Sequence, residues 1–401
     1  LRAMLADVEL DARRRAVIVS AVRTPIARAY RGALAGVRAD DLAALAAREA
    51  VARCEGLAPQ DIDDVICGAA WHTGEQSLNL GRVVGQLADL PASVPGTTVN
   101  RFCSSSLQAI RMAQHAIAAA EGHVFLVVGA ESVTRAAGLA WDEEEHAHPR
   151  FTDRSRPDYV SDLYIAMGET AENVAERWGI TRARMDELAL RSHRQAVAAR
   201  DAGAFGREIV PVDLGDGTAF ANDECPRPDT SAERLAGLEP AFRANGSVTA
   251  GNACPLSDGA AAVVVTSEAY ARDHGLTPLV RIVASAVTGI EPEIMGVGPV
   301  AAVTRVLDRT RMQVSDIDVV ELNEAFAAQV LAVCDELGVD IDRQLNPHGG
   351  GIALGHPFGM TGARIMTTLI NDLETRDQTY GIETMCVGGG QGMAMLVERL
   401  N

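Results

Sequence analysis

The sequence predicts an α/β protein built from two copies of one plan, because strand-like and helix-like segments alternate twice in the same order. A strand-like run begins at Ala16 (AVIVSAVRTPIA), and a similar run begins at Val280 (VRIVASAVTGI). An apolar fraction of 47% with few aromatic residues suits helices that pack closely on sheets. At 401 residues the chain is long enough for two hydrophobic cores and a deeply buried site.

The elements that follow each of these strands also match. A helical segment leads to DIDDVICG in the first half and to DIDVVELNEAF in the second. Next come TTVNRFC and QLNPHGGGIALGHPFGMTG, each followed by a helix, and both halves end on an apolar strand that runs into glycine. Two related halves bring their equivalent strand ends together, so residues at these ends are candidates for one site. They are Cys103, Asn323, His356 and Cys386.

The stretch 136–276 is predicted to be an inserted loop domain together with the last elements of the N-terminal half. We find no counterpart for it in the second half, and we expect it to cover the site and contact substrate. The remaining boundaries are an N-terminal extension over 1–15, an N-terminal half over 16–135 and a C-terminal half over 277–401.

Charge and composition exclude several function classes. A formal net charge of −18 repels a phosphate backbone, so nucleic acid is not expected as a partner, and an anionic substrate would need a local arginine patch. The sequence contains no lysine, which excludes Schiff-base chemistry and a P-loop.

The seven cysteines are widely spaced and include no C-x-x-C pair. They favour reduced thiols and a cytoplasmic location over a disulfide framework. The N-terminus lacks the apolar core of a signal peptide, and no apolar stretch is long enough to span a membrane, so we expect no membrane insertion.

Cys103 stands where an extended segment meets a helix. There a thiol meets free backbone N–H groups and the positive end of the helix dipole, which favour the thiolate. The alternative is a small buried residue, with the serines from Ser104 to Ser106 capping the helix.

His356 lies in a glycine-rich segment and is followed by Pro357. An imidazole held there can take a proton from a thiol or donate to an oxyanion; a turn with a local hydrogen bond is the alternative. His348 nearby is interpreted as structural.

Cys386 ends a strand before three glycines, which allow close approach of an acyl group, although a lone buried cysteine is more often core. Asn323 follows a strand and begins NEAF. It is a candidate N-cap, or its amide holds a water that supports an oxyanion. His146 and His148 beside Asp142 to Glu145 resemble a metal pair without a placed third ligand, so no metal site is predicted.

Four motifs, NRFCSSSLQAI, NEAF, GGGIALGHPFGMTGAR and CVGGGQGMA, occur in this order, and together they resemble the thiolase family over nearly the whole chain from Ala16. The resemblance implies two βαβαβαββ halves, with helices sandwiched between mixed sheets, and an inserted loop domain. It also implies that Cys103 attacks the 3-keto carbon of a 3-ketoacyl-CoA and releases acetyl-CoA, after which coenzyme A accepts the acyl group.

The resemblance further implies the roles of the other site residues. His356 activates the nucleophile, and Cys386 exchanges a proton with the acetyl-CoA carbon or the incoming thiol. One oxyanion is bound by His356 and a water on Asn323, and the other by the backbone N–H groups of Cys103 and Gly388. No cofactor is implied, because coenzyme A and acetyl-CoA are substrates.

The family's coenzyme A contacts correspond to Arg227 near the adenine and to Met167 and Phe242 along the pantetheine. Ala166 stands where biosynthetic thiolases often have His, and Cys254 stands in the pocket wall where many have Ser. These departures favour a degradative thiolase for a longer or bulky acyl chain, from fatty-acid or steroid side-chain β-oxidation. The alternative is a biosynthetic acetyl-CoA C-acetyltransferase that makes acetoacetyl-CoA.

The motifs argue against two other interpretations. A β-ketoacyl synthase has no cysteine in its last glycine-rich strand, so Cys386 argues against it. A non-catalytic lipid-binding relative would have a degraded motif, and none is degraded. Thiolases are dimers or dimers of dimers, so a homodimer or homotetramer is expected.

Overall fold

A computed structural model describes residues 11–136, 146–160 and 163–400. All of its strands except β6 (Val212–Asp213) and β7 (Ala219–Phe220) form one continuous sheet. They lie in the order β10 (Val319–Leu322), β11 (Tyr380–Val387), β12 (Gln391–Arg399), β9 (Val280–Gly289), β1 (Ala16–Arg23), β8 (Ser257–Ser267), β5 (Val124–Ser132), β3 (Asp64–Gly68) and β4 (Gly96–Val99), with β2 (Ala27–Arg28) beside β8.

The sheet is mixed, as predicted. The pairs β3–β4, β3–β5 and β10–β11 are parallel, whereas the other pairs are antiparallel. The strands of the two halves join where β1 pairs with β9 over two residue pairs, Val17 with Arg281 and Ile18 with Val280.

The stretch 136–276 includes β8, one of the last elements of the N-terminal half, and this strand has a counterpart in the second half that the comparison of the two halves in the sequence missed. Strand β8 runs antiparallel to β5 just as β12 runs antiparallel to β11. The difference is the connection, because β11 and β12 are joined directly while more than a hundred residues separate β5 from β8. That separation hid the hairpin in the sequence.

Alternate residues of the strands point into different cores. In β5, Leu126 and Val128 join a core on the outer face, whereas Phe125 and Val127 join the inner core. Both faces of the strand are covered, which explains why it is apolar from Val124 to Ala130.

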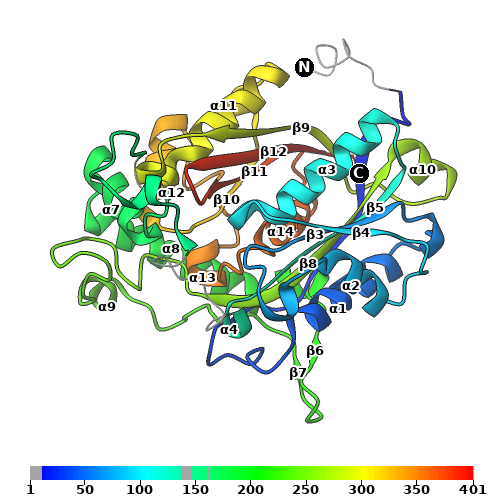
Figure 1. Ribbon diagram of the computed structural model, residues 1–401, viewed down its shortest axis with the longest axis horizontal. Coiled ribbons are helices and arrows are strands. Elements are labelled where there is room, and N and C mark those ends of the chain that lie inside the picture. The colour runs from blue at the N-terminus through cyan, green and yellow to red at the C-terminus, as the bar shows by residue number, and fades with distance from the viewer. Residues whose placement is uncertain (1–10, 137–145, 161–162, 401) are drawn as a thin grey trace.

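Helices form the other layers (Figure 1). The inner layer consists of α3 (Ser105–Ala119) and α14 (Thr361–Thr375), packed between the strands of the two halves. Helices α1 (Ala39–Ala52) and α2 (Leu80–Leu87) cover the N-terminal strands, and α11 (Gly298–Thr310) and α12 (Ala327–Leu337) cover the C-terminal ones. The layers therefore alternate helix, strand, helix, strand, helix.

The shorter elements connect these layers. The remaining helices are α4 (Val133–Ala136), α6 (Pro149–Thr152), α7 (Met167–Trp178), α8 (Arg182–Asp201), α9 (Ala232–Ala236), α10 (Glu268–Asp273) and α13 (Gly351–Leu354). A hairpin is formed by β6 (Val212–Asp213) and β7 (Ala219–Phe220), and the 3-10 helices are η2 (Pro59–Asp61), η3 (Gly74–Gln76), η4 (Phe102–Ser104), η5 (Ala204–Arg207), η6 (Pro292–Val297) and η7 (Val314–Asp316).

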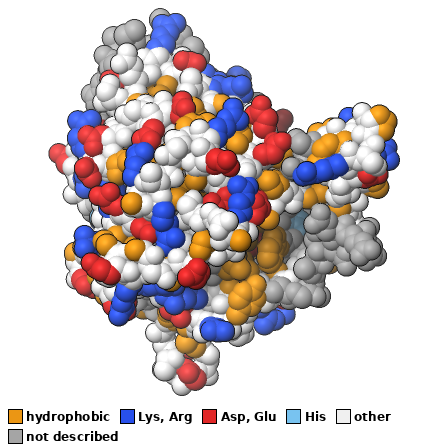
Figure 2. All heavy atoms as spheres, turned by 90° about the vertical axis from the view of Figure 1, so that its left-hand side faces the viewer, with side chains coloured by type: hydrophobic (Ala, Val, Ile, Leu, Met, Phe, Trp, Pro, Cys, Tyr) orange, Lys and Arg blue, Asp and Glu red, His pale blue; other side chains and the backbone are white. Residues whose placement is uncertain are grey.

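Helices α7, α8 and α9 of the insertion gather on one side of the molecule, beside α12 (Figure 1). On that face the surface is hollowed, and hydrophobic side chains floor the hollow among charged ones (Figure 2). Within the described ranges, no helix combines the length and apolar character needed to cross a membrane.

Candidate active site

Cys103 lies in η4, directly before α3, which is the helix start that the sequence predicts. The turn is held by Ser105, whose Oγ accepts a hydrogen bond from Arg101 N at 3.0 Å and donates one to Phe102 O at 2.7 Å. Ser104, the N-cap residue, makes no side-chain cap. Phe102 adopts a left-handed φ of 46°, so the backbone bends sharply just before the thiol.

Two backbone N–H groups contact the Cys103 sulfur. The N–H groups of Gly388 and of Cys103 itself hydrogen-bond to it and lower the thiol pKa, but burial, the largest effect, raises that pKa to about 12. The group is therefore a neutral thiol at physiological pH, and its attack on a carbonyl requires a base.

Two further cysteines lie close to Cys103. Cys386 is buried near the end of β11, and burial, the largest effect, together with the neighbouring Cys103 and Cys254 raises its pKa well above the usual value. Cys254 donates its backbone N–H to Ala325 O at 3.0 Å, and burial, followed by the neighbouring Cys103, raises its pKa. Cys386 is thus a protonated thiol next to the candidate nucleophile.

The protonation state of His356 follows from its hydrogen bonds. Thr361 Oγ1 lies 2.6 Å from Nδ1 of His356, and the same hydroxyl donates to Pro357 O at 2.7 Å. Because the hydroxyl's only proton is used in that bond, Nδ1 must be the donor, and Nε2 carries the lone pair. Burial, followed by the charge of Arg364, lowers the pKa of His356 to about 3, so the imidazole is a neutral acceptor.

Asn323 does not cap α12, which was one of its two predicted roles. The N-cap of that helix is Phe326, and Asn323 Nδ2 instead lies 3.2 Å from His356 Nε2. Its backbone N–H donates to Thr384 O of β11, two residues before Cys386. Asn323 Oδ1 is buried, and no group of the described chain hydrogen-bonds to it.

The loop that carries His356 is fastened to the start of α3. Ala363 N donates to Ser106 Oγ at 2.9 Å. A Cβ built on Gly362 would lie 2.3 Å from Leu107 N, so only glycine allows this close approach of the two inner helices. The structure therefore brings Cys103 of the N-terminal half close to two parts of the C-terminal half, the His356 loop and Cys386.

Sequence reasoning missed Glu131, a buried carboxylate at the end of β5. Its Oε2 accepts from Ala70 N at 2.9 Å and from Gly359 N at 2.8 Å, while its Oε1 accepts from Trp71 N and Gln76 Nε2. Burial raises its pKa to about 7 despite these donors. Glu131 thus ties the 70–76 loop of one half to the His356 loop of the other.

Glu324 was also missed, although it stands in the NEAF motif. It is buried and accepts hydrogen bonds from Ser192 Oγ at 2.6 Å, Asn346 Nδ2 at 2.9 Å and Ile352 N at 3.2 Å. These bonds hold the glycine-rich segment that leads to His356. Nothing in the local sequence indicates such distant partners.

Three of the four candidate coenzyme A residues lie in or beside the apolar cluster that contains Cys386. Met167 and Cys254 pack in one apolar cluster with Cys386, and the Phe242 ring lies 6.0 Å from that of Phe326 in the same cluster. Arg227 lies apart from this cluster, where its backbone N–H donates to His193 Nδ1 at 3.2 Å.

The remaining histidines of the sequence analysis lie elsewhere. His348 contacts Asp372 of α14. His148 caps α6 by accepting from Arg150 N at 3.2 Å, and the neighbouring acidic run Asp142 to Glu145 lies outside the described residues.

Two family models match nearly the whole chain. The family model for the thiolase N-terminal domain matches residues 16–269, and that for the thiolase C-terminal domain matches residues 276–399. The chain belongs to the thiolase family. It is an acyltransferase whose substrates are acyl-CoA and coenzyme A, and its activity is a thiolase-type, CoA-dependent cleavage.

Relatives of this thiolase cover nearly its whole length. A β-ketoadipyl-CoA thiolase of Escherichia coli is 47% identical over 96% of this chain and 100% of its own. A 3-ketoacyl-CoA thiolase of Bacillus subtilis is 42% identical over 96% of this chain and 99% of its own. The crystal structure of the dimeric peroxisomal thiolase of Saccharomyces cerevisiae is 36% identical, with a TM-score of 0.90 and full coverage of both chains.

Proposed function

We propose that this thiolase cleaves a 3-ketoacyl-CoA with coenzyme A, giving acetyl-CoA and a shortened acyl-CoA, through an acyl-enzyme on Cys103. The environment of the Cys103 thiol supports the proposal most strongly. Two backbone N–H groups hydrogen-bond to its sulfur, and the protonated thiol of Cys386 lies beside it. A neutral imidazole on the adjoining loop completes the set.

In the first half-reaction, Cys103 gives its proton to Nε2 of His356 as the sulfur bonds to the 3-keto carbon. The bond between C2 and C3 then breaks, and its electron pair leaves as the enolate of acetyl-CoA. That carbon takes the proton of Cys386, whose raised pKa keeps the thiol protonated until this step. The acyl group stays on Cys103 as a thioester.

In the second half-reaction, the thiol of coenzyme A gives its proton to the Cys386 thiolate and attacks the thioester carbon. Cys103 leaves as a thiolate and regains its proton from protonated His356. The burial that lowers the pKa of this imidazole makes it a strong acid once it is charged, which favours that return. Both thiols and the imidazole end as they began.

Two oxyanions arise in these steps, and each has a candidate binding group. The N–H groups of Cys103 and Gly388 would bind the oxygen at the 3-keto carbon. His356 and a water on Asn323 would bind the enolate oxygen, and the unpartnered buried Oδ1 supports a water there. One such donor is worth about 3 kcal/mol of the barrier. No step requires a metal or a redox cofactor.

For the acyl group, the proposal is a longer or bulky chain in the degradative direction, as in fatty-acid or steroid side-chain β-oxidation. The names of the relatives support a degradative direction and extend the range to an acyl chain that ends in a carboxylate. Formation of acetoacetyl-CoA is the alternative, and it would use the same residues in reverse.

We also propose that the protein acts as a homodimer or homotetramer in the cytoplasm. The dimeric yeast structure supports self-association, and β4 leaves one edge of the sheet open. The seven free thiols support a reducing compartment.

Kinetics of the two half-reactions test the proposal. Cys103→Ala should lose thiolysis of acetoacetyl-CoA and longer 3-ketoacyl-CoA substrates. Cys386→Ser should still form an acyl-enzyme from an acyl-CoA but cleave the carbon–carbon bond slowly. Cys54→Ser, two residues after the end of α1, is the control and should change neither. Retained thiolysis in Cys103→Ala would disprove the nucleophile, and an unchanged rate of carbon–carbon cleavage in Cys386→Ser would disprove the proton transfer to the enolate carbon.

A further inference from the structure

The two backbone donors at the Cys103 sulfur belong to different halves of the chain. Cys103 lies in η4 of the N-terminal half, whereas Gly388 begins the turn between β11 and β12 in the C-terminal half. The turn consists of three glycines, and Gly389 and Gly390 adopt left-handed φ angles of 74° and 76°. Glycines bring no side chains that could fix the turn, so its position beside Cys103 must be set by other residues.

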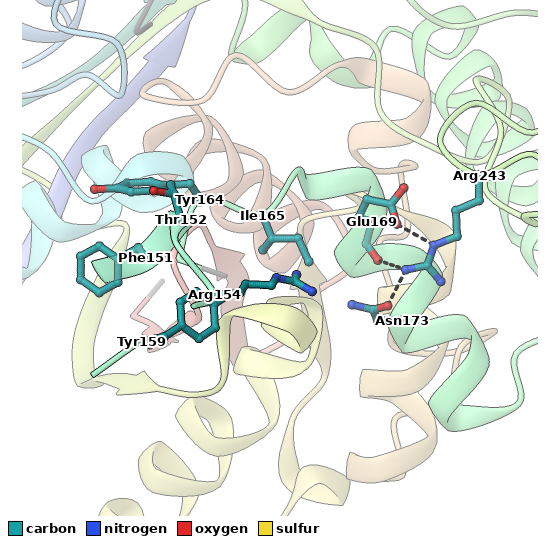
Figure 3. A pocket seen from close by; sticks show the side chains of 9 residues that line it. All are labelled: Phe151, Thr152, Arg154, Tyr159, Tyr164, Ile165, Glu169, Asn173 and Arg243. Carbon is teal, nitrogen blue, oxygen red and sulfur yellow. Dashed lines mark hydrogen bonds and ion pairs between the residues drawn. The ribbon is translucent and has the colours of Figure 1, made fainter. Parts of the chain in front are cut away.

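Few side chains of the described residues pack against this turn. A Cβ built on Gly389 would lie 3.6 Å from Leu163 Cδ1 and 3.9 Å from Phe102 Cε2. Leu163 stands next to Tyr164 and Ile165, which line a cavity of about 460 Å³ in the inserted segment (Figure 3). The inserted segment therefore touches the turn lightly and itself borders open space, so other contacts must hold the turn in place.

A chain of side-chain hydrogen bonds joins the glycine turn to the turn that carries Cys103. Arg101 Nη1 donates to Gln391 Oε1 at 2.8 Å, and Gln391 Nε2 donates to Gly388 O at 3.1 Å. A guanidinium has donors and no acceptor, so Arg101 holds the oxygen of the amide toward itself and the nitrogen toward Gly388. The backbone of Gln391 pairs with Val387 in the β11–β12 ladder. The ladder thus fixes the chain before Gly388, and the Gln391 side chain fixes the peptide after it.

Arg101 is itself fastened to the turn of Cys103. Its N–H donates to Ser105 Oγ at 3.0 Å, and its carbonyl oxygen accepts from Ser104 N at 3.1 Å. A second arm of the guanidinium, Nε, donates to Gln108 Oε1 of α3 at 2.9 Å. Both side-chain acceptors are neutral amide oxygens, and burial lowers the pKa of Arg101, so the placement of this cation costs stability. Unfavourable placements of this kind are expected at functional sites.

From these contacts we infer that Arg101 and Gln391 are positioning residues, which hold the two backbone N–H groups at the Cys103 sulfur at the separation that an oxyanion requires. The inference rests on the proposed function, because the oxyanion forms at the carbonyl carbon that Cys103 attacks. Arg101 acts through Gln391, and Gln391 acts through Gly388 O, so neither side chain has to touch substrate. Their loss should therefore slow the steps in which the oxyanion forms and leave substrate binding nearly unchanged.

Methionine substitutions test this inference, because they keep the length of each side chain and remove its hydrogen-bonding groups. In thiolysis of acetoacetyl-CoA or 3-oxohexanoyl-CoA, whichever the wild type cleaves faster, Arg101→Met and Gln391→Met should each lower kcat by about 10- to 100-fold with KM within about twofold. The loss is smaller than for removal of a whole donor, since Gly388 keeps its N–H. The double variant should lose no more than the more affected single variant, because both residues act on one N–H group.

The infrared carbonyl band of the acyl-enzyme reports directly on the two N–H groups. The acyl-enzyme is formed from an acyl-CoA with a ¹³C-labelled carbonyl in the absence of free coenzyme A. Hydrogen bonds from N–H groups polarise the carbonyl, so the wild-type band should lie at a lower frequency than that of a free thioester. Both methionine variants should move the band toward the frequency of the free thioester. A side chain needed only for folding would not move it.

A second variant and a matched control complete the test. Gln391→Glu keeps an acceptor for Arg101 and removes the donor to Gly388 O, so it should lower kcat while the contact with Arg101 preserves the fold, and it decides the test if a methionine variant does not fold. Arg111→Met is the control, because Arg111 lies on α3 and also reaches the C-terminal half, where its Nε donates to Ser285 Oγ at 3.2 Å. The control should change neither kcat nor the carbonyl band.

Four results would overturn the inference: a wild-type kcat in Gln391→Glu, additive losses in the double variant, an unshifted carbonyl band, or an equal loss of kcat in Arg111→Met. Each of them would leave the Cys103 chemistry intact, because the acyl-enzyme would still form. If the wild type formed no acyl-enzyme on Cys103, the proposed function itself would fail.

Discussion

Replacing Thr361 by Val tests how the neutral histidine is prepared for catalysis. Val keeps the shape of the side chain and removes only the hydroxyl. That hydroxyl accepts from Nδ1 of His356 at 2.6 Å and donates to Pro357 O at 2.7 Å. Without it, a buried Nδ1–H has no acceptor, and the tautomer with the proton on Nε2 becomes competitive.

The magnitude follows from the burial of the site. Leaving one buried donor unsatisfied costs about 1–3 kcal/mol, and this cost falls on the tautomer that can accept the Cys103 proton. Since about 1.4 kcal/mol corresponds to a factor of ten, the acylation rate should fall by about 5- to 150-fold. Substrate binding should change little, because the hydroxyl faces the histidine and a backbone carbonyl.

Rapid mixing with an acyl-CoA, followed by the release of coenzyme A in the first turnover, measures the acylation rate directly. Thr367→Val is the matched control, because its hydroxyl lies on the same helix and donates only to Ala363 O at 2.8 Å. The control should acylate at the wild-type rate. The reasoning is refuted if Thr361→Val acylates within twofold of the wild type, or if both variants slow equally.

Three further outcomes follow from the buried network. Glu131→Gln should lower kcat by at least tenfold while KM changes little. In either orientation the amide nitrogen would face two N–H donors, and each donor left unsatisfied costs about 1–3 kcal/mol. An unchanged kcat would refute the role of Glu131 in holding the His356 loop. The wild-type kcat should decline as pH falls through about 7, because the raised pKa lets Glu131 take a proton there. A kcat that declines only near pH 3, where His356 takes a proton, would contradict this. Gly362→Ala should lower the free energy of unfolding by about 1–3 kcal/mol or more, because its Cβ would meet Leu107 N, whereas Gly206→Ala has nothing within 4 Å and should leave the Tm nearly unchanged.

The sequence predicted those parts of the fold that depend on local pattern. Strands covered on both faces are mainly apolar, as in β5 from Val124 to Ala130, and the glycine-rich ends of the strands marked where a backbone approaches closely. Cys103 could be placed at a helix start because the extended TTVN segment precedes a helical pattern.

Other features depend on contacts between distant residues and left no local signal. An Asn after a strand is typical of an N-cap, and only the folded chain brings Asn323 to His356, 33 residues later. A glutamate at the end of an apolar strand gives no sign that donors from two distant loops converge on it, as they do at Glu131.

The hairpin of β5 and β8 was hidden for a similar reason, since the insertion separates its strands.

Peptide mass spectrometry tests directly whether Cys103 carries the acyl group. The enzyme is mixed with an acyl-CoA in the absence of free coenzyme A, quenched in acid and digested, and the peptides are analysed by mass spectrometry. An acyl mass increase is expected on the peptide that contains Cys103, and it should disappear when coenzyme A is added. An acyl group on Cys386 or Cys254 instead, or no acylated cysteine while thiolysis proceeds, would contradict it.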